Sequence, residues 1–403
     1  MKKTKHIFTI TFFASFWVFF IAKSTEKTQN IIIEKKQDTI LNVLVGATQM
    51  QEYLPKLQGK NVALVVNNTA LFPNGTHLVD TLLALKVNVR KVFAPEHGFR
   101  GNIDAGETVQ NMQDKKTLLP IISLYGTNKK PTAEQLQDVE IIIFDIQDVG
   151  VRFYTYISTL HYVMEACAEN NKILIVLDRP NPNASYIDGC VLQKGFESFV
   201  GMHPVPIVYG LTIGEYALMI NGEKWLKNQI ITNLMVIKNK NYTHQTIYSL
   251  PVKPSPNLPN DLAIALYPSL CLFEGTNISV GRGTTYPFQV IGFPDVNMGQ
   301  FSFTPVSIDG MAKQPMYQNQ ICYGIDLRQT SPKYQFTLQY IIDFYHKTTT
   351  KDTFFNQYFN TLVGNSVLQW QIKQGLSEEE IRKTWQEDIK KYKITREKYL
   401  LYP

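Results

Sequence analysis

Three short apolar runs of this sequence each lead directly into residues whose side chains can do chemistry. Carboxylates act as acids, bases and nucleophiles, arginines clamp anions, and tyrosines and amides exchange hydrogen bonds. The run at 89–93 is followed by Glu96, His97 and Arg100. The run at 141–144 is followed by Asp145, Gln147, Asp148, Arg152 and Tyr154, and the run at 173–177 by Asp178 and Arg179. This set of side chains would support acid–base catalysis.

Glu96 is the strongest candidate for a general acid. It stands between Pro95 and Gly98 in the run PEHG, a rigid turn that can hold a carboxyl group at the mouth of a cleft. The alternative is that Glu96 caps the next helix or pairs with Arg100. His97 is a candidate base, a hydrogen-bond donor to a substrate hydroxyl, or a packing residue. Metal ligation is its weakest assignment, because no H-x-x-x-H or H-E-x-x-H spacing accompanies it.

Asp145 and Asp148 are candidates for a second catalytic group. They lie three residues apart directly after an apolar run, where either could orient a water molecule or bind substrate hydroxyls. A salt bridge with Arg152 is the alternative. Glu107, in the run DAGE, either faces the same cleft or belongs to a solvated turn. Glycosidases combine an acid such as Glu96 with a base, a nucleophile, or a group that steers the substrate's own acetamido substituent.

The second half of the chain has one further polar cluster. Glu274 leads into a loop in which Gly281 and Gly283 flank Arg282, and Tyr286 follows. Glycine on both sides of an arginine indicates a backbone that comes close to a ligand, with the guanidinium free to bind a carboxylate as a fork. A phosphate would fit the same fork.

The elements that must position these residues follow an alternating pattern. From residue 60 on, helix-length segments separate short apolar runs, which predicts βαβ units and a parallel sheet. Residues directly after the strands then meet at one edge, where open parallel sheets bind ligands. The first strand ends in NNTALFPNG rather than G-x-G-x-x-G, so the loop that binds a dinucleotide is missing. We expect an α/β fold with a Rossmann-like parallel sheet domain, and neither a cofactor nor a metal.

The alternation of apolar runs and helix-length segments ends after residue 210. TIGEYALMINGEKWL predicts an amphipathic helix that begins at Thr212, with Glu215 completing a capping box. A proline-rich loop follows, and SEEEIRKTWQEDIKKYK predicts a helical region near the C-terminus. These features divide the chain into a signal peptide or N-terminal anchor at 1–25, the Rossmann-like domain at 40–230, and a smaller α/β domain at 231–403.

The N-terminus and the charge pattern indicate the compartment and the partners. Three lysines precede the apolar run 7–22, as in an export signal, so we expect a periplasmic or extracellular protein. An uncleaved membrane anchor is the alternative. The net charge of +6 is spread along the chain rather than gathered into a stripe, which argues against nucleic-acid binding. Four widely spaced cysteines without a C-x-x-C pair favour small, buried side chains, with a single disulfide as the alternative.

Seven stretches of the sequence together resemble one known family. FAPEHGFRG, DAGE, SLYG, FDIQDVGVRFYTYISTL, VLDRPNPN, PSPNLPN and FEGTNISVGRGTTYPF are similar to the signature blocks of the NamZ-type exo-β-N-acetylmuramidases, a family long described only as a domain of unknown function. The resemblance extends from about residue 43 to the C-terminus. It implies a Rossmann-like domain beside a smaller α/β domain, with the active site in the cleft between them.

The resemblance also implies a reaction. The family removes terminal N-acetylmuramic acid from the non-reducing end of β-1,4-linked peptidoglycan fragments, so the expected partners are MurNAc-GlcNAc saccharides and muropeptides. The glutamate of the family's P-E-H-G block, here Glu96, is the proposed acid, and an arginine fork at Arg282 would match the lactyl carboxylate. We assign Glu96, His97, Asp145 and Asp148 to catalysis, and Arg100, Glu107, Gln147, Arg152, Tyr154, Asn257, Glu274, Arg282 and Tyr286 to substrate binding.

Two rival functions are compatible with parts of the sequence. The stronger is a non-catalytic envelope protein that binds muropeptides in the same cleft without turnover. Glu96 favours the enzyme, because binding alone would not require an acid there. A serine hydrolase is the weaker rival, since the sequence has neither G-x-S-x-G nor S-x-x-K.

Overall fold

A computed structural model describes residues 42–96, 98–100, 112–331 and 333–403 of the chain. The predicted signal or anchor at 1–25, His97 and Glu107 lie outside the described residues. Within the described ranges, no helix is long and apolar enough to cross a membrane. All four cysteines are described, and each is buried, as predicted, and free.

Strands and helices alternate in the first part of the chain, and helices dominate the last part. The elements up to residue 237 are η1 (Gly46–Thr48), α1 (Met50–Leu57), β1 (Asn61–Val66), α2 (Leu78–Ala84), β2 (Asn88–Ala94), β3 (Met112–Gln113), β4 (Pro120–Ser123), β5 (Ile141–Asp145), α3 (Tyr156–Glu169), β6 (Ile173–Leu177), α4 (Ile213–Gly222), η2 (Lys227–Gln229) and β7 (Asn233–Ile237). Those that follow are α5 (Asp261–Leu270), η3 (Cys271–Gly275), β8 (Val290–Phe293), η4 (Val296–Met298), β9 (Phe301–Phe303), β10 (Cys322–Asp326), α6 (Gln339–Lys347), η5 (Lys351–Thr353), α7 (Tyr358–Val363), α8 (Val367–Lys373), α9 (Glu378–Lys383) and α10 (Gln386–Glu397).

The first sheet has the strand order β3-β4-β2-β1-β5-β6-β7. Neighbouring strands are parallel, except that the short edge strand β3 pairs antiparallel with β4. With β3 set aside, the order of the parallel strands is that of a Rossmann fold. The strand order reverses between β1 and β5, and sheets of this kind bind ligands beyond the carboxyl ends at that point. The predicted Rossmann-like domain is therefore confirmed.

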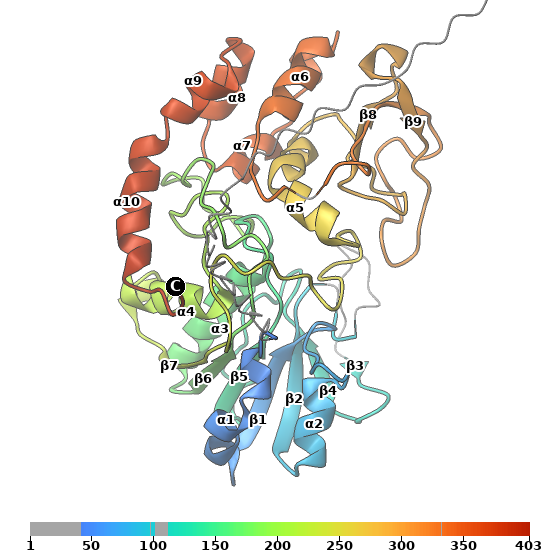
Figure 1. Cartoon of the computed structure of the whole chain (residues 1–403). Coiled ribbons are helices and arrows are strands. Elements are labelled where there is room, and N and C mark those ends of the chain that lie inside the picture. Colours follow the sequence, from blue (N-terminus) through green and yellow to red (C-terminus); the bar gives the residue numbers. More distant parts are fainter. Residues whose placement is uncertain (1–41, 97, 101–111, 332) are drawn as a thin grey trace, which may run out of the picture. The chain divides into compact units, whose positions relative to one another are not determined.

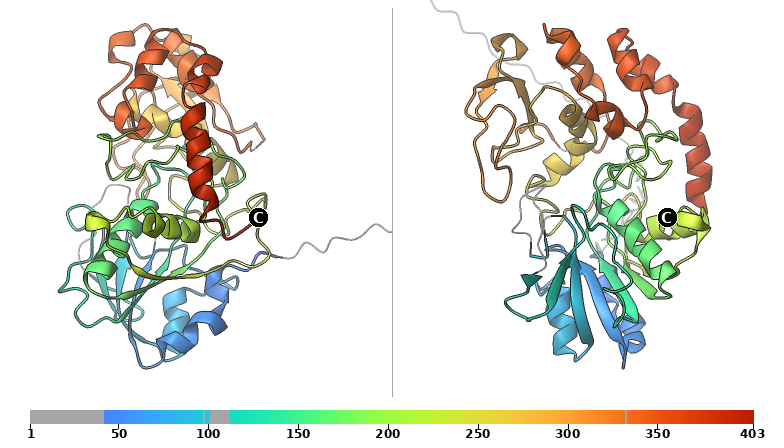
Figure 2. Two further views of the ribbon diagram at one scale, coloured as in Figure 1. Left: turned by 90° about the vertical axis from the view of Figure 1, so that its left-hand side faces the viewer. Right: turned by 180° about the vertical axis from the view of Figure 1, so that it is seen from behind.

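Alternate residues of the central strands enter two different cores. In β1, Ala63 and Val65 pack in the same cluster as residues of α3 and α4, whereas Val62, Leu64 and Val66 pack with α1 and α2. Figures 1 and 2 show α1 and α2 on one face of the sheet and α3 and α4 on the other. Because both faces are covered, the strands are apolar throughout, which explains the continuous apolar runs of the sequence.

The capping box predicted at Thr212 is present at the start of α4. The Thr212 hydroxyl accepts a hydrogen bond from the backbone N–H of Glu215 (3.3 Å), and the Glu215 carboxylate accepts one from the backbone N–H of Thr212 (2.9 Å). The same carboxylate contacts Nε2 of His244 (2.9 Å). A local sequence signal thus determines the first residue of the helix, and the distant His244 adds a contact to the capping glutamate.

The second, smaller domain is built on a three-stranded antiparallel sheet in the order β8-β10-β9. Helix α5 precedes this sheet in the chain, and α6 to α10 follow it (Figure 1). The predicted C-terminal helical region forms two helices, α9 and α10, that are interrupted at Thr384 and Trp385. Strand β7 pairs with β6, so the first sheet extends past residue 230, where the sequence predicted the boundary.

Arg152 holds together segments of both domains, although the sequence assigned it to substrate binding. Its side chain is 0% exposed. The guanidinium donates to the carbonyls of Cys190 (2.9 Å) and Val205 (2.7 Å) after β6, and to those of Leu362 (3.1 Å) and Val363 in α7. The last two carbonyls end a helix, where the helix dipole favours a positive charge. Arg152 is therefore a structural residue in this fold.

Replacing Arg152 by methionine should destabilise the protein strongly. Methionine fills the apolar part of the space but leaves the four buried carbonyls without this donor. We expect the free energy of unfolding, measured by urea denaturation, to fall by about 3–5 kcal/mol. As a matched control, Arg328→Met removes a partly exposed pair with Asp326 and should cost less than about 1 kcal/mol. Equal losses in the two variants would contradict the structural role of Arg152.

Candidate active site

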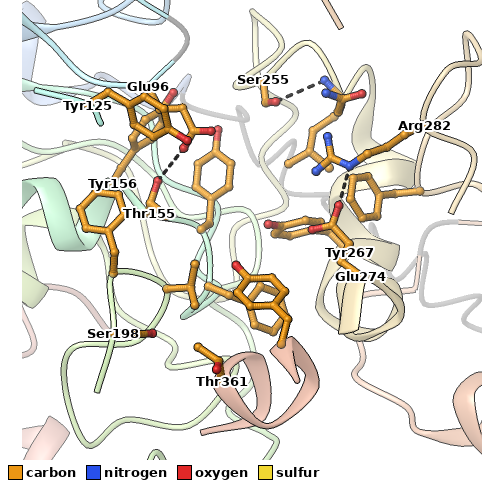
Figure 3. A pocket seen from close by; sticks show the side chains of 18 residues that line it. Glu96, Tyr125, Thr155, Tyr156, Ser198, Ser255, Tyr267, Glu274, Arg282 and Thr361 are labelled. Carbon is orange, nitrogen blue, oxygen red and sulfur yellow. Dashed lines mark hydrogen bonds and ion pairs between the residues drawn. The ribbon is translucent and has the colours of Figure 1, made fainter. Parts of the chain in front are cut away.

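A pocket of about 410 Å³ opens at the carboxyl ends of the parallel strands. Its walls come from the loops after β2, β4 and β5 in the first domain and from α5, η3 and α7 in the second (Figure 3). The residues that line it are Glu96, Tyr125, Phe153, Tyr154, Thr155, Tyr156, Ser198, Phe199, Val200, Ser255, Asn257, Leu258, Tyr267, Glu274, Arg282, Phe288, Tyr358 and Thr361. Both domains are needed to form this pocket.

Glu96 lies at one side of the pocket, in a tight turn after β2. The backbone N–H of Gly98 donates to the carbonyl of Pro95 (3.1 Å), and Gly98 has a left-handed φ of +74°, which glycine favours. The hydroxyl of Thr155 donates to Oε2 of Glu96 (3.2 Å; Figure 3). Burial raises the pKa of Tyr125 to about 12, and the nearby Glu96 carboxylate adds to this rise. Tyr125 therefore remains a protonated donor beside Glu96 at neutral pH.

Arg282 and Glu274 form an ion pair at the other side of the pocket. Nε of Arg282 lies 2.5 Å from Oε1 of Glu274, and the Cys271 thiol donates to the second carboxylate oxygen (3.6 Å). Gly281 and Gly283 have left-handed φ angles of +78° and +81°, so the predicted glycine-dependent turn around Arg282 is present. Burial lowers the pKa of Arg282, but the charge of Glu274 and its hydrogen bond, with smaller contributions from Tyr267 and Cys271, together leave the pKa raised. The guanidinium thus keeps its charge next to the pocket.

Tyrosines occupy the wall between the two carboxylates. Burial raises the pKa of Tyr358, and the charges of both Glu274 and Glu96 add to the rise. Burial also raises the pKa of Tyr267, with a further contribution from Glu274. These phenols are protonated at neutral pH, and their ring faces offer apolar surface next to their hydroxyl groups. Such a wall can pack against a sugar ring and donate hydrogen bonds to its substituents.

The two glutamates have different partners, which suits two different chemical roles. Hydroxyl groups surround Glu96, whereas an arginine holds Glu274. Among the described lining residues, these are the only carboxylates. Two carboxylates in unlike environments can divide the work of glycoside hydrolysis between a proton donor and a stabilising group. The sequence assigned Glu274 to substrate binding, and the structure adds that it shares one pocket with Glu96.

Several residues predicted from the sequence do meet in this pocket, namely Glu96, Tyr154, Asn257, Glu274 and Arg282. The Asn257 side chain is 1% exposed, and its Nδ2 donates to the carbonyl of Met311 (2.9 Å). Its Oδ1 has no hydrogen-bond partner among the described residues. Since Nδ2 is already used, the free oxygen is an acceptor for a donor that a ligand would supply.

Asp145 and Gln147 do not line the pocket. The Asp145 carboxylate binds Nε and Nη2 of Arg179 (2.5 and 2.9 Å), so its salt bridge is with Arg179 and not with Arg152. The Gln147 amide donates to the carbonyls of Asp148 (2.8 Å) and Pro180 (2.6 Å). Both side chains fasten the loops after the strands, because buried backbone carbonyls and charges at a strand end need partners. We therefore correct the assignment of Asp145 to catalysis and of Gln147 to substrate binding: both side chains position the loops.

Arg100 and Tyr286 also lie outside the set of lining residues. Arg100 donates to both carboxylate oxygens of Asp114 (3.0 and 2.8 Å) and lies next to Asp80 (3.5 Å), so it does not pair with Glu96. The guanidinium of Arg328 lies 4.2 Å from the ring centroid of Tyr286. The substrate-binding roles predicted for Arg100 and Tyr286 receive no support from their positions.

Several residues that line the pocket were not among those predicted from the sequence. Tyr125 and Thr155 stand inside the blocks SLYG and FDIQDVGVRFYTYISTL, so their neighbours in the chain did indicate the site. Tyr267 and Tyr358 come from helices α5 and α7 and belong to no motif that we identified. Only the packing of the second domain against the first brings them to the pocket.

The fold and the pocket define a two-domain α/β protein with two carboxylates and several tyrosines in one pocket, a set of side chains that suits a glycosidase. The chain belongs to the NamZ exo-β-N-acetylmuramidase family. The N-terminal family model matches residues 62–262, and the C-terminal model matches residues 265–402. Membership of a glycosidase family decides against the non-catalytic alternative.

Relatives with known names or structures match nearly the whole chain. The peptidoglycan β-N-acetylmuramidase NamZ of Bacillus subtilis (strain 168) is 38% identical over 376 residues, which cover 88% of this chain and 90% of that protein. Two solved structures of DUF1343 family proteins from Bacteroides fragilis NCTC 9343 are also similar. They have TM-scores of 0.84 and 0.74 at 47% and 29% identity, and each comparison covers 90% of this chain and 99% of the other.

Asp148, which the sequence assigned to catalysis, is buried next to a tyrosine and does not line the pocket. Its Oδ2 accepts hydrogen bonds from the backbone N–H of Gly150 (2.6 Å) and from the Tyr209 hydroxyl. Its Oδ1 has no partner among the described residues. Burial raises the pKa of Asp148 to about 7, although these hydrogen bonds lower it. Asp148 is therefore placed to hold a loop and not to contact a substrate.

The raised pKa of Asp148 should make the fold less stable as the pH rises. The folded state binds the proton more tightly than the unfolded state, whose pKa is about 3.9, so this stabilisation is complete below pH 4 and is lost between about pH 4 and 7. In Asp148→Asn, the decline of the melting temperature from pH 5 to 7.5 should be smaller than in the wild type. Asp309→Asn, at an exposed position, is the control. An unchanged decline in Asp148→Asn would count against a protonated Asp148.

Proposed function

We propose that this chain is an exported, exo-acting glycoside hydrolase that removes terminal, non-reducing β-1,4-linked N-acetylmuramic acid from peptidoglycan fragments. The observation that carries the proposal is that Glu96 and the Glu274–Arg282 pair line one pocket at the carboxyl ends of the parallel strands. The named activity of the Bacillus subtilis relative supports the choice of peptidoglycan and of the muramic acid unit. The apolar segment that follows the N-terminal lysines supports export to the cell envelope.

In this proposal, Glu96 is the general acid that protonates the oxygen of the leaving sugar. The Thr155 hydroxyl fixes the orientation of its carboxyl group, and Tyr125 supplies a second donor next to it. A proton delivered to the glycosidic oxygen lets the bond to the anomeric carbon break without forming an alkoxide. Positive charge then develops on the sugar ring, and the negative charge of Glu274 is placed in the same pocket to stabilise it.

Arg282 is proposed to recognise the lactyl carboxylate of the terminal sugar. Its Nε is bonded to Glu274, and no described residue holds its two terminal nitrogens. A guanidinium has five N–H donors, so the donors on these nitrogens are available to a carboxylate. The free Oδ1 of Asn257 is proposed to accept a hydrogen bond from an N–H or O–H group of the same sugar.

The first test is sugar selectivity. The purified protein without residues 1–25 should release the chromophore from an aryl β-N-acetylmuraminide and leave the matching N-acetylglucosaminide nearly untouched, because only the former carries the carboxylate that Arg282 would bind. The release of aryl alcohol is measured with both substrates at equal concentration. Equal turnover of the two sugars, or turnover of the glucosaminide alone, would rule out the proposed specificity.

The second test is Glu96→Gln, which keeps the size of the side chain but removes the proton that it would donate. Activity on a muramyl disaccharide should fall by about 10²–10⁴-fold, the usual contribution of a general acid. A dinitrophenyl muraminide has a leaving group that needs little protonation, so its loss should be much smaller. The decisive quantity is the ratio of kcat/KM between the two substrates.

Glu379→Gln, at an exposed position on α9, is the control for loss of a surface carboxylate and should leave both rates unchanged. An equal loss on both substrates in Glu96→Gln would exclude Glu96 as the acid. Full activity on the disaccharide would exclude a catalytic role for it altogether.

A further inference from the structure

Lys129 is a cation next to Phe199, a residue that lines the pocket, and it has no acidic partner among the described residues. Its Nζ lies 4.6 Å from the ring centroid of Phe199. The next residue, Lys130, forms ion pairs with Glu165 (2.7 Å) and Glu169 (2.6 Å). The charge of Lys130 is therefore paired within the fold. Lys129 is half-buried, and its ammonium group contacts the aromatic ring of Phe199.

The loop that carries Lys129 also carries a tyrosine that contacts the proposed acid. Tyr125 and Lys129 both follow β4, and the Glu96 carboxylate is close enough to Tyr125 to add to the burial that raises the pKa of its hydroxyl. The Asn128 amide donates to the carbonyl of Ser123 (2.7 Å), and the backbone N–H of Tyr125 donates to the Ser123 hydroxyl (3.2 Å). These bonds fold the loop back onto the end of the strand. Lys129 thus lies on the same loop as Tyr125, which lines the pocket next to Glu96.

The segment that carries Phe199 also presents an unused hydroxyl group to the pocket. Residues 198–200 form the tip of a tight turn that lines the pocket, closed by two backbone hydrogen bonds between Ser198 and Gly201 (2.9 and 3.0 Å). The Ser158 hydroxyl anchors the turn through the carbonyl of Phe199 (2.7 Å). The Ser198 hydroxyl is buried and has no partner among the described residues. In Figure 3 it lies on the side of Glu96 and Tyr156, across the pocket from Arg282.

We propose that Lys129, Phe199 and Ser198 form a subsite for the leaving part of the substrate, in which Lys129 binds a carboxylate. This inference rests on the proposed function. A general acid delivers its proton to the oxygen between the two halves of the substrate. If the terminal sugar lies towards Arg282, groups on the Glu96 side face the half that leaves. In a peptidoglycan fragment, the carboxylates of that half are the lactyl group or the stem peptide of the next muramyl residue.

Steady-state kinetics with fragments of defined length test this subsite. The substrates are the disaccharide MurNAc-GlcNAc, whose leaving sugar is uncharged, and the tetrasaccharide of two such units, both without peptide and with a stem peptide on the inner muramyl residue. Lys129→Met should raise the ratio of the tetrasaccharide KM to the disaccharide KM by about two- to fivefold, the value of a partly exposed ion pair. Lys129→Arg should restore the wild-type ratio, since it keeps the charge.

Lys56→Met, on the exposed surface of α1, controls for the general effect of losing one positive charge. A raised ratio with either tetrasaccharide supports the subsite, and the fragment that shows it identifies the lactyl or the peptide carboxylate. An unchanged ratio in Lys129→Met, with a wild type that cleaves every fragment, overturns the subsite and leaves the proposed function standing. A wild type that cleaves none of the fragments overturns both.

Discussion

The buried charge of Arg152 is the constraint on which the pocket depends. A guanidinium without access to water needs acceptors, and here backbone carbonyls from two distant segments accept hydrogen bonds from both terminal nitrogens, Nη1 and Nη2. One segment, between Cys190 and Val205, includes the turn that lines the pocket with Ser198. The other ends α7, the helix that contributes Tyr358 to the wall between the two glutamates. Because one cation binds both segments, it couples the positions of these two parts of the pocket lining.

The need of buried polar groups for hydrogen-bond partners also explains why most of the charged residues after the strands do not line the pocket. Loops that leave a buried parallel sheet carry backbone groups which need partners away from water. Asp178, fully buried after β6, accepts hydrogen bonds from the Thr212 hydroxyl and the Gly214 backbone at the start of α4, and from Tyr402. The Asp145 carboxylate likewise accepts a hydrogen bond from Nε of Arg179. Of the carboxylates that follow the described strands of the first sheet, Glu96 is the one that lines the pocket.

The two sides of the pocket differ in a way that matches an asymmetric reaction. Glu96 is surrounded by neutral hydroxyl donors, and Glu274 by a cation. In addition to burial, the charges of both glutamates raise the pKa of Tyr358, so both carboxylates act on the part of the pocket that Tyr358 lines. A reaction that needs a proton on one side of a bond and negative charge on the other can use such a difference directly. The first domain supplies Glu96, and the second supplies both Glu274 and its arginine.

The sequence by itself determined the parts of this protein that depend on local or periodic signals. Apolar runs predicted the parallel strands, the Thr212 capping box fixed the start of α4, and the glycines beside Arg282 predicted a turn that needs left-handed φ angles. The motif blocks also contain Glu96, Glu274 and Arg282, which the structure brings together in one pocket. Only the tertiary structure decided which strand-end residues face the pocket and which hold loops, because that choice depends on partners far away in the chain. Asp145 pairs with Arg179, and Arg152 donates to a carbonyl of α7. No spacing in the sequence predicts either contact.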